Sequence, residues 1–436
     1  MKIEALVNVT RRAADGLADI HIRLESGQEY QLDLPYRDLY RRCGLPNALA
    51  MDLLITASLC YIVDKGVPRS GSTDNWTRDL EITIPVSDSQ LWTGVAEELA
   101  ETLAFLTGDS WHFTFSQLAE PIFAGSETLM PASSSTQVVS LFSGGLDSLA
   151  GAIDLLNSNA ARILFMGHYD SSGLKVQSVL ASALDLRYPN RCDIQHVRVA
   201  HRPDQAIENT LRLRSFLFIA IGLYGAQAFG PRTPLYMFEN GLIALNVPLT
   251  PSRRGSCSTR TAHPYYLHRL RAVLGRLGIQ NPIITPYALK TKGECLSECK
   301  DQEILRRLAN TSVSCSHASR KQDWVRKSAT NCGYCIPCIF RRAALSKVGL
   351  DDGSLYGIDV LAGELNPNDE IESANDLRAV VDFLRGGLSP AALRKEIIST
   401  ALFPDLEAHA EMASRGFYEV KGWLEGAGRS AQRFVN

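Results

Sequence analysis

The pattern of apolar and polar residues changes character near residue 130. Before this point, short alternating segments that predict strands are mixed with helical segments. After it, uninterrupted apolar runs alternate with long helical stretches, as in a parallel sheet covered by helices on both faces. We therefore predict an α/β protein in which an N-terminal α+β domain precedes a doubly wound parallel sheet, with a helical extension after it.

The N-terminal part, residues 1–124, has the pattern of a small α+β domain with a mostly antiparallel sheet. Apolar spacing predicts a helix over 47–67 and another over 89–107, which Ser89 begins and Gly108 ends. Alternation predicts strands over 3–9, 19–24, 29–34, 79–86 and 111–115. This part carries no motif that indicates chemistry, so we expect it to contact a partner or another copy of the chain.

A polar stretch rich in small residues, 125–137, predicts a linker. We place the doubly wound sheet domain at 138–349 and a helical C-terminal extension at 350–436. The strands expected in the sheet domain are 138–142, 163–166, 194–199 and 235–238, and the helices expected in the extension are 376–384, 390–400 and 405–424. Ligands of such sheets bind beyond the carboxyl ends of the strands.

One turn of the sheet domain has the composition of a phosphate-binding loop, between the first apolar run and a helix. Its glycines let the backbone bend closely around a ligand, and the first amides of the helix form an anion site. Asp147 would repel an anion, so a Mg²⁺ ion between its carboxylate and the phosphates is expected. The alternative is an ordinary turn in which Asp147 only caps the helix. The residues of this turn are Ser143, Gly144, Gly145, Leu146, Asp147 and Ser148.

Four cysteines have the spacing of a zinc site. Cys332, Cys335 and Cys338 form a C-x2-C-x2-C motif, and Cys315 lies upstream. Four thiolates bind Zn²⁺ tetrahedrally and leave no position for a substrate, which predicts a structural site. The alternatives are an iron–sulfur cluster, free thiols, or His317 as the fourth ligand in place of Cys315.

Composition excludes several classes of protein. The 436 residues carry a net charge of −2, which argues against a general nucleic-acid-binding surface. The first residues are charged where a signal peptide needs apolar ones, and the apolar run over 215–230 is too short for a membrane span. Ten cysteines, clustered late in the chain, fit a metal site in a reducing compartment. We expect a soluble, cytoplasmic protein.

The S-G-G-x-D-S turn resembles the PP-loop of the N-type ATP pyrophosphatases, and together with the four cysteines it resembles QueC, the 7-cyano-7-deazaguanine synthase family. The resemblance covers about 138–345. Arg214 opens an apolar helix where the family has an Arg-Asn pair, with Ser215 in place of the Asn. The segment 286–294 is similar to a family segment that ends in Lys-x-Glu, which here is Lys292 to Glu294.

The chain departs from that family in one loop. Residues 246–264 stand where the family has an acidic, tyrosine-rich substrate loop. This loop and the flanking parts resemble the QueC-like proteins of bacterial anti-phage operons, such as QatC. The resemblance to that group implies partner proteins encoded in the same operon.

The resemblance implies ATP-dependent adenylation of the carboxylate of a 7-deazaguanine, release of pyrophosphate and attack by an amine, with ATP, Mg²⁺ and Zn²⁺ as cofactors. Asp147, Lys292 and Arg214 are the expected catalytic residues, although either cation can instead be a surface charge. Glu239 and Asn240 follow a strand and are expected to contact the base, with a loop cap as the alternative. The expected substrate-lining residues of the divergent loop are Arg260, Thr261 and His263.

Three other functions stay open at this point. The chain can be an ordinary synthase that makes the nitrile from ammonia, another PP-loop enzyme that acts on tRNA, or a subunit that binds nucleotide without catalysis. The near-neutral charge argues against the tRNA enzyme, and the intact motif from Ser143 to Ser148 argues against the non-catalytic subunit.

Overall fold

The structure of the protein is a computed structural model, and it describes residues 1–12, 16–124, 136–158, 161–169, 173–202, 208, 210–250, 260–318 and 320–426, without the side chains of 9–12. Nearly all of the expected linker, 125–137, lies outside these residues, as does 251–259 of the divergent loop.

Eleven strands and fifteen helices are described, and most of the expected elements are among them. The strands are β1 (Lys2–Arg12), β2 (Ala18–Leu24), β3 (Glu29–Asp33), β4 (Asp79–Val86), β5 (Ser110–Gln117), β6 (Thr136–Leu141), β7 (Arg162–His168), β8 (Cys192–Val197), β9 (Ala200–Arg202), β10 (Leu235–Tyr236) and β11 (Ile283–Ile284). The helices are α1 (Tyr36–Cys43), α2 (Ala48–Gly66), α3 (Ser89–Thr93), α4 (Ala96–Thr107), α5 (Leu146–Ser158), α6 (Gly173–Arg187), α7 (Arg214–Phe229), α8 (Gly241–Leu245), α9 (Pro264–Arg276), α10 (Lys292–Ser297), α11 (Gln302–Leu308), α12 (Ile336–Lys347), α13 (Ala374–Leu384), α14 (Pro390–Ile398) and α15 (Leu406–Gly426).

The second sheet is parallel throughout, which confirms this part of the predicted α/β fold. Its five strands lie in the order β11-β10-β6-β7-β8, and each neighbouring pair is parallel. The chain begins the sheet at β6, continues outward through β7 and β8, and then returns to add β10 on the other side of β6. The strand order therefore reverses between β6 and β10, where ligands of open α/β sheets bind.

Helices cover both faces of this sheet, as the continuous apolar runs predict. Val139 and Leu164 belong to the core that the sheet shares with α2, α7 and α9. Their neighbours Val138 and Ile163 belong to the opposite core, with α5, α6, α10 and α11. Side chains that alternate along a strand point to opposite faces, so each face buries its own set of residues.

The N-terminal sheet is more mixed than expected. Its order is β5-β4-β1-β2-β3-β9. The pairs β1–β2, β2–β3 and β3–β9 are antiparallel, whereas β1–β4 and β4–β5 are parallel. Strand β9 comes from the sheet domain predicted at 138–349, and it pairs Leu32 with His201. The edge of the N-terminal sheet is therefore built by a later part of the chain.

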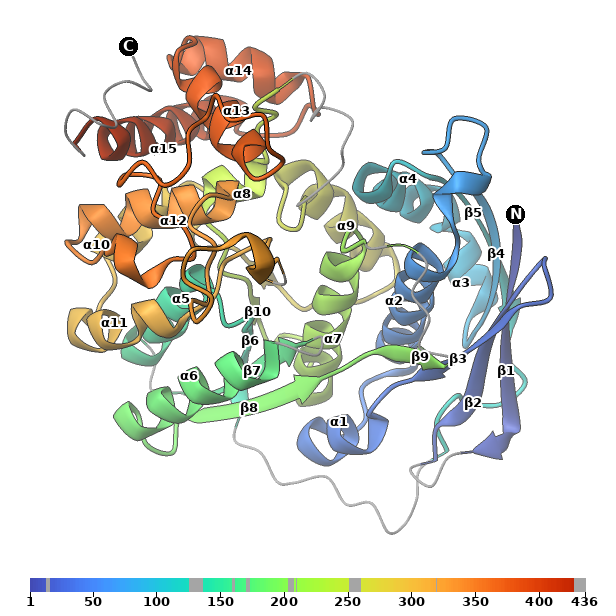
Figure 1. Ribbon diagram of the computed structural model, residues 1–436. Coiled ribbons are helices and arrows are strands. Elements are labelled where there is room, and N and C mark those ends of the chain that lie inside the picture. Colours follow the sequence, from blue (N-terminus) through green and yellow to red (C-terminus); the bar gives the residue numbers. More distant parts are fainter. Residues whose placement is uncertain are drawn as a thin grey trace.

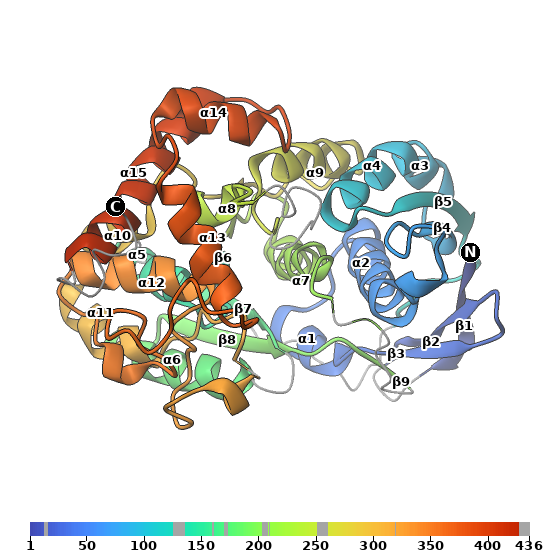
Figure 2. The same cartoon turned by 45° about the horizontal axis from the view of Figure 1, so that its top comes forward.

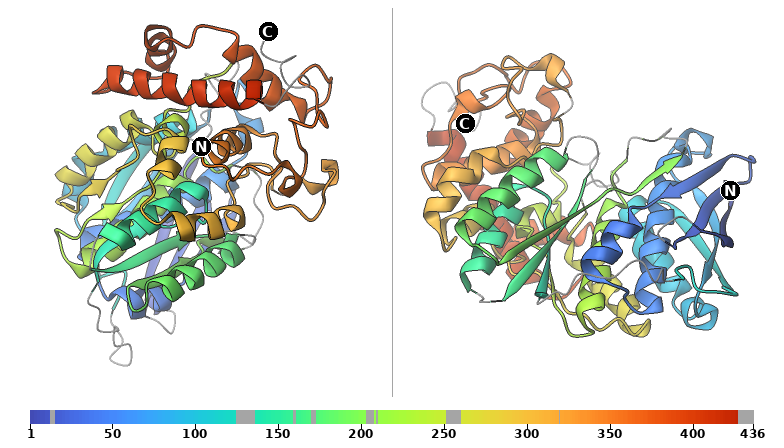
Figure 3. Two further views of the ribbon diagram at one scale, coloured as in Figure 1. Left: turned by 90° about the vertical axis from the view of Figure 1, so that its left-hand side faces the viewer. Right: turned by 90° about the horizontal axis from the view of Figure 1, so that it is seen from below.

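The two sheets lie on either side of a helical layer made by α2 and α7 (Figure 1; Figure 3). Buried apolar residues of the N-terminal sheet, both helices and the parallel sheet form one continuous core. A second link is a buried ionic cluster, in which Asp64 and Asp109 accept hydrogen bonds from Arg78. Thr210, which precedes α7, also donates to Asp64 at 2.9 Å. The N-terminal part is thus packed firmly against the second sheet.

The C-terminal helices lie at the end of the molecule away from the N-terminal sheet (Figure 2). Helix α15 packs against α8, α10 and α12. Arg342 in α12 is buried and pairs with Asp351 and Asp359. Asp351 also accepts a hydrogen bond from the indole nitrogen of Trp423 in α15, at 3.0 Å. The extension is therefore fixed to the sheet domain through charged and aromatic contacts.

The helix expected over 89–107 is two helices. Gly94 and Val95 separate α3 from α4, and the side chain of Asp88, instead of Ser89, accepts the capping bond from the amide of Leu91 at 2.9 Å. Gly108 ends α4 with a φ of +74°, as predicted, because glycine adopts the left-handed conformation without steric cost.

Candidate functional site

The turn between β6 and α5 places its polar groups at the point where the strand order reverses. Gly144 has a φ of +80° and is closely surrounded by side chains of α6. The hydroxyl of Ser143 is exposed and lies 3.2 Å from that of Ser148, which donates to the carbonyl of Gly145 at 3.0 Å. Both hydroxyls therefore lie together at the N-terminus of α5.

Asp147 forms a buried ion pair with Lys292. The ammonium group of Lys292 lies 2.6 Å from Oδ1 of Asp147, and both residues are buried. Because Lys292 is buried, it is not a surface charge. The ion pair joins the N-terminus of α5 to that of α10. The negative charge at this turn is thus balanced by a lysine 145 residues away in the sequence.

Asn240 completes this contact from the end of β10. Its side-chain amide donates to Oδ2 of Asp147 at 2.8 Å, and its Oδ1 caps α8 by accepting from the amide of Ile243 at 3.2 Å. The expected alternative role as a cap is therefore present, together with a contact to the loop. Asp147, Lys292 and Asn240 join the segments that follow β6, β11 and β10.

Glu239 precedes Asn240 and is partly buried. Burial raises the pKa of its carboxyl group to about 7, the nearby charge of Asp147 also raises it, and Lys292 lowers it. Two carboxylates that repel each other rarely stay fully ionised together. Glu239 can therefore gain or lose a proton near neutral pH.

Arg214 lies beside the end of β7. Its Nε is 3.3 Å from Nδ1 of the buried His168, and its Nη2 donates to the carbonyl of His168 at 3.3 Å. Gln177 in α6 donates to that carbonyl and to the carbonyl of Ser143. His168 and Gln177 thus connect Arg214 with the loop, and no motif in the sequence indicated either residue.

Ser314 is a further loop residue that the sequence did not reveal. Its hydroxyl accepts a hydrogen bond from the amide of Leu146 at 3.2 Å, at the start of α5. The adjacent amide of Val313 donates to the carbonyl of Gly144 at 3.1 Å. Because Ser314 directly precedes Cys315, the segment that enters the cysteine cluster also lies against the turn.

The four predicted cysteines come together. Their sulfur atoms all lie within 4.8 Å of one another, with 3.8 Å between Cys332 and Cys338 and 4.0 Å between Cys315 and Cys335. Zinc–sulfur bonds of about 2.3 Å in a tetrahedron require sulfur atoms about 3.8 Å apart. The cluster can therefore hold a zinc ion, and it offers four ligands without a vacant position.

The geometry also bears on the alternatives for this cluster. An iron–sulfur cluster places several atoms between its cysteines and would need a wider opening. Within the described residues, His317 is not among the side chains that converge at the site, and its ring lies against Tyr334. Gly333 has a φ of +91°, and a Cβ there would lie 2.1 Å from the carbonyl oxygen of Ile358. The turn between the first two cysteines of the motif therefore needs glycine.

The described residues of the divergent loop contact the N-terminal and C-terminal parts. Arg260 donates to the carbonyl of Phe105 at 2.6 Å and lies over its ring. His263 is completely buried between Phe105 and Phe403, and its Nδ1 caps α9 by accepting from the amide of Tyr265. Thr261 follows Arg260 in the sequence and is partly buried.

These contacts give Arg260 and His263 a packing function where the sheet domain meets the N-terminal part and the C-terminal extension. The expectation that Arg260, Thr261 and His263 line a substrate site stays a prediction.

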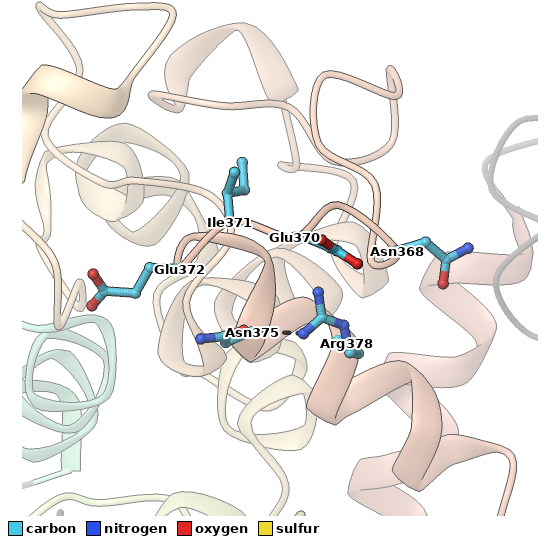
Figure 4. A pocket seen from close by; sticks show the side chains of 6 residues that line it. All are labelled: Asn368, Glu370, Ile371, Glu372, Asn375 and Arg378. Atoms are coloured by element: carbon cyan, nitrogen blue, oxygen red, sulfur yellow. Dashed lines mark hydrogen bonds between the residues drawn. The ribbon is translucent and has the colours of Figure 1, made fainter.

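A separate hollow of about 600 Å³ lies in the C-terminal extension, between the segment 368–372 and the first turns of α13 (Figure 4). Arg378 there donates to Asn375 and to the carbonyls of Pro367 and Asp369. Its polar groups are used within the extension, and the hollow shares no residue with the Asp147 contact. The residues that border it are Asn368, Glu370, Ile371, Glu372, Asn375 and Arg378.

No protein-family model, curated protein or solved structure matches the chain. Among the residues that the structure describes, no helix has both the length and the apolar character required to cross a membrane.

Replacement of one cysteine should remove the metal and loosen the loop. We expect Cys335→Ser to contain less than a tenth of a zinc ion per chain and to melt at a lower temperature, because metal binding and local folding are coupled. Cys299→Ser, at a buried cysteine outside the cluster, should keep its zinc. Elemental analysis measures the zinc content of each variant, and calorimetry measures its melting temperature. A wild-type protein purified without metal, or a Cys335→Ser protein of unchanged melting temperature, would contradict the assignment.

The buried His263 should make the protein less stable in mild acid. Burial, followed by the charges of Arg260 and His409, lowers the pKa of His263 to about 3. An unfolded histidine titrates near pH 6.5, so below that pH the unfolded state binds a proton that the folded state does not. Stability is fully present above pH 6.5 and falls towards pH 3.

Between pH 6.5 and 5.0 this histidine alone should reduce the free energy of unfolding by about 1.6 kcal/mol. His263→Asn keeps an N-cap acceptor and removes the titration. Urea unfolding at both pH values should therefore show a smaller loss for the variant. Parallel losses in the two proteins would show that His263 does not cause the effect.

Proposed function

We propose that this chain is an ATP pyrophosphatase of the PP-loop type that adenylates the carboxylate of a 7-deazaguanine. One observation carries the proposal: the S-G-G-x-D-S turn lies where the strand order of a parallel sheet reverses, with Asp147 held by Lys292 and Asn240. The resemblance of this turn and of the four cysteines to the QueC family supports the choice of substrate.

The proposed reaction has two steps. A carboxylate oxygen of the substrate bonds to the α-phosphorus of ATP, and the bond from that phosphorus to the bridging oxygen of the β-phosphate breaks. Pyrophosphate leaves and an acyl-adenylate remains. The nitrogen of an amine then bonds to the acyl carbon, AMP leaves with the bonding electron pair, and the amine loses a proton.

The loop would stabilise the pyrophosphate as it leaves. Ser143 presents its hydroxyl at the start of α5, whereas the hydroxyl of Ser148 donates to the carbonyl of Gly145. The dipole of this 13-residue helix favours negative charge at the same end. Donors fixed before the reaction need no reorganisation when charge develops on the leaving oxygen. The contact of Ser314 with Leu146 holds the first turn of the helix in place.

The donor set also fits a magnesium ion. Asp147 and Glu239 supply carboxylate oxygens near the turn. Oδ1 of Asp147 keeps a lone pair beside its bond from Lys292, whereas Oδ2 accepts from both the backbone and the side-chain nitrogen of Asn240. When bound, Mg²⁺ would neutralise charge on the phosphates. Lys292 contributes positive charge beside Asp147, and Arg214 contributes positive charge from the end of β7.

Glu239 can serve the second step. A carboxyl group with a pKa of about 7 exchanges its proton readily at neutral pH, so it can accept the proton of the attacking amine. The same group can form a hydrogen bond with the amide-like edge of the base, as the sequence predicts.

The acceptor of the acyl group is a separate part of the proposal. The resemblance to the QueC-like proteins of anti-phage operons favours an amine of a partner protein and a role in antiviral defence. An ordinary synthase instead uses ammonia, and a second activation step dehydrates the resulting amide to the nitrile. Both reactions share the adenylation step.

Removal of one loop hydroxyl should slow the release of pyrophosphate. With ATP, Mg²⁺ and 7-carboxy-7-deazaguanine, we expect Ser143→Ala to lower kcat by about 100-fold, the usual effect of losing one donor to a developing anion. This variant leaves the ion pair of Asp147 and Lys292 intact. Ser158→Ala, at the other end of α5, is the matched control and should react as wild type.

Measurement of AMP and pyrophosphate distinguishes this reaction from hydrolysis to ADP. Equal kcat values in the two serine variants, or ADP as the product, would refute the assignment of the loop.

The acceptor is identified by incubating the enzyme with ATP, Mg²⁺ and 7-carboxy-7-deazaguanine, with ammonia in one sample and the partner proteins of the operon in another. We expect intact-mass spectrometry to show a partner protein that gains the mass of the deazapurine acyl group. Free nitrile in the ammonia sample without any modified partner would instead identify an ordinary synthase.

A further inference from the structure

The strongest unexplained contact to the candidate site comes from the C-terminal helix. Glu419 in α15 accepts a hydrogen bond from the hydroxyl of Thr291 at 2.6 Å and another from the amide of Gly293 at 3.2 Å. Thr291 and Gly293 are the two neighbours of Lys292 in the sequence. The carboxylate of Glu419 therefore binds both sequence neighbours of the lysine that pairs with Asp147, one through its side chain and the other through its backbone.

The hydrogen bonds around Thr291 form a chain. Thr291 caps α10, since its hydroxyl accepts from the amide of Glu294 at 3.0 Å while donating to Glu419. Glu294 completes the capping box by accepting from the amide of Thr291 at 2.9 Å. The capping box thus fixes the first turn of α10, and Glu419 of α15 in turn binds the capping residue Thr291.

A second residue of α15 holds the other half of this cap. The guanidinium group of Arg415 binds both carboxylate oxygens of Glu294, at 2.7 and 3.2 Å. Arg415 and Glu419 are four residues apart and so lie on the same face of α15. One face of the C-terminal helix therefore contacts both members of the capping box.

Gly293 provides an independent sign that this approach is close. A Cβ at this position would lie 2.6 Å from Oε2 of Glu419, closer than non-bonded atoms approach each other. The position thus accepts glycine because the carboxylate of α15 occupies the space where a side chain would begin.

We propose that Glu419 is a positioning residue for Lys292, acting through Thr291 and Gly293 at the start of α10. Its importance for catalysis depends on the proposed function, whereas its effect on Lys292 does not. The C-terminal extension would then complete the nucleotide site in addition to packing against the sheet domain. Lys347, which also binds Glu419 at 2.7 Å, balances the charge of the carboxylate from an exposed position.

The test measures how readily the amine of Lys292 reacts with a water-soluble acetylating ester, by mass spectrometry of the peptide that contains it. In the wild type, burial and the bond to Asp147 should protect this amine, while the exposed Lys175 should react readily. We expect Glu419→Gln, which keeps the size of the side chain but loses one acceptor, to increase acetylation of Lys292 about tenfold.

Glu425→Gln is the matched control, because Glu425 lies on the same helix and faces Lys421. The control should leave Lys292 as protected as in the wild type. Equal protection in Glu419→Gln and Glu425→Gln would overturn the proposal.

A second variant guards against a general loss of structure. Gly293→Ala keeps every charge and displaces the Glu419 carboxylate, so it should also expose Lys292 to acetylation. Circular dichroism establishes that both variants are folded. If Glu419→Gln unfolds, Gly293→Ala decides the question, and a folded Gly293→Ala protein with a fully protected Lys292 would refute the positioning role.

Kinetics provide a readout that distinguishes positioning from binding. Glu419→Gln should lower kcat for pyrophosphate release about tenfold and leave KM for ATP nearly unchanged, because Glu419 acts through the lysine. An inactive wild type would refute the proposed function but not the acetylation result. A rise in KM alone would assign Glu419 to nucleotide binding and contradict the positioning role.

Discussion

The buried ion pair between Asp147 and Lys292 is the constraint on which the candidate site depends. Removing one partner of a buried ion pair lowers the free energy of unfolding by about 3–5 kcal/mol, because the remaining charge stays buried without a partner. The pair also fixes geometry, since it joins the N-termini of α5 and α10. Asn240 adds the end of β10. Three segments that are distant in sequence are thus fixed at the point where ligands of parallel sheets bind.

The flanking parts of the chain support this constraint from two sides. The N-terminal part shares its core with the parallel sheet through α2 and α7, and it takes its last strand, β9, from the middle of the chain. The C-terminal helix α15 contacts the cap of α10 through Arg415 and Glu419. Both parts therefore have structural functions within the chain, and any contact with a partner protein would use surfaces that remain exposed.

Local patterns predicted the parts of the fold that depend on local chemistry. The glycine turn at Gly144 and the cysteine knuckle at Cys332 could be recognised because a tight bend and a four-ligand metal site both require particular residues at short spacing. The pairing of Lys292 with Asp147 spans 145 residues, and no local pattern encodes that distance. His263 was expected to line a substrate site, but its local sequence did not show that it caps α9 and is buried against aromatic rings from two other parts of the chain.

The exchange of radiolabelled pyrophosphate into ATP tests most directly whether this geometry forms an adenylating site. The measurement needs no amine acceptor, so it isolates the step assigned to the loop, Asp147 and Lys292. With Mg²⁺ and 7-carboxy-7-deazaguanine present, label should enter ATP, and without the carboxylate it should not, because only an acyl-adenylate can react backwards with pyrophosphate. Absence of exchange in a folded, zinc-loaded protein that binds both substrates would contradict the account.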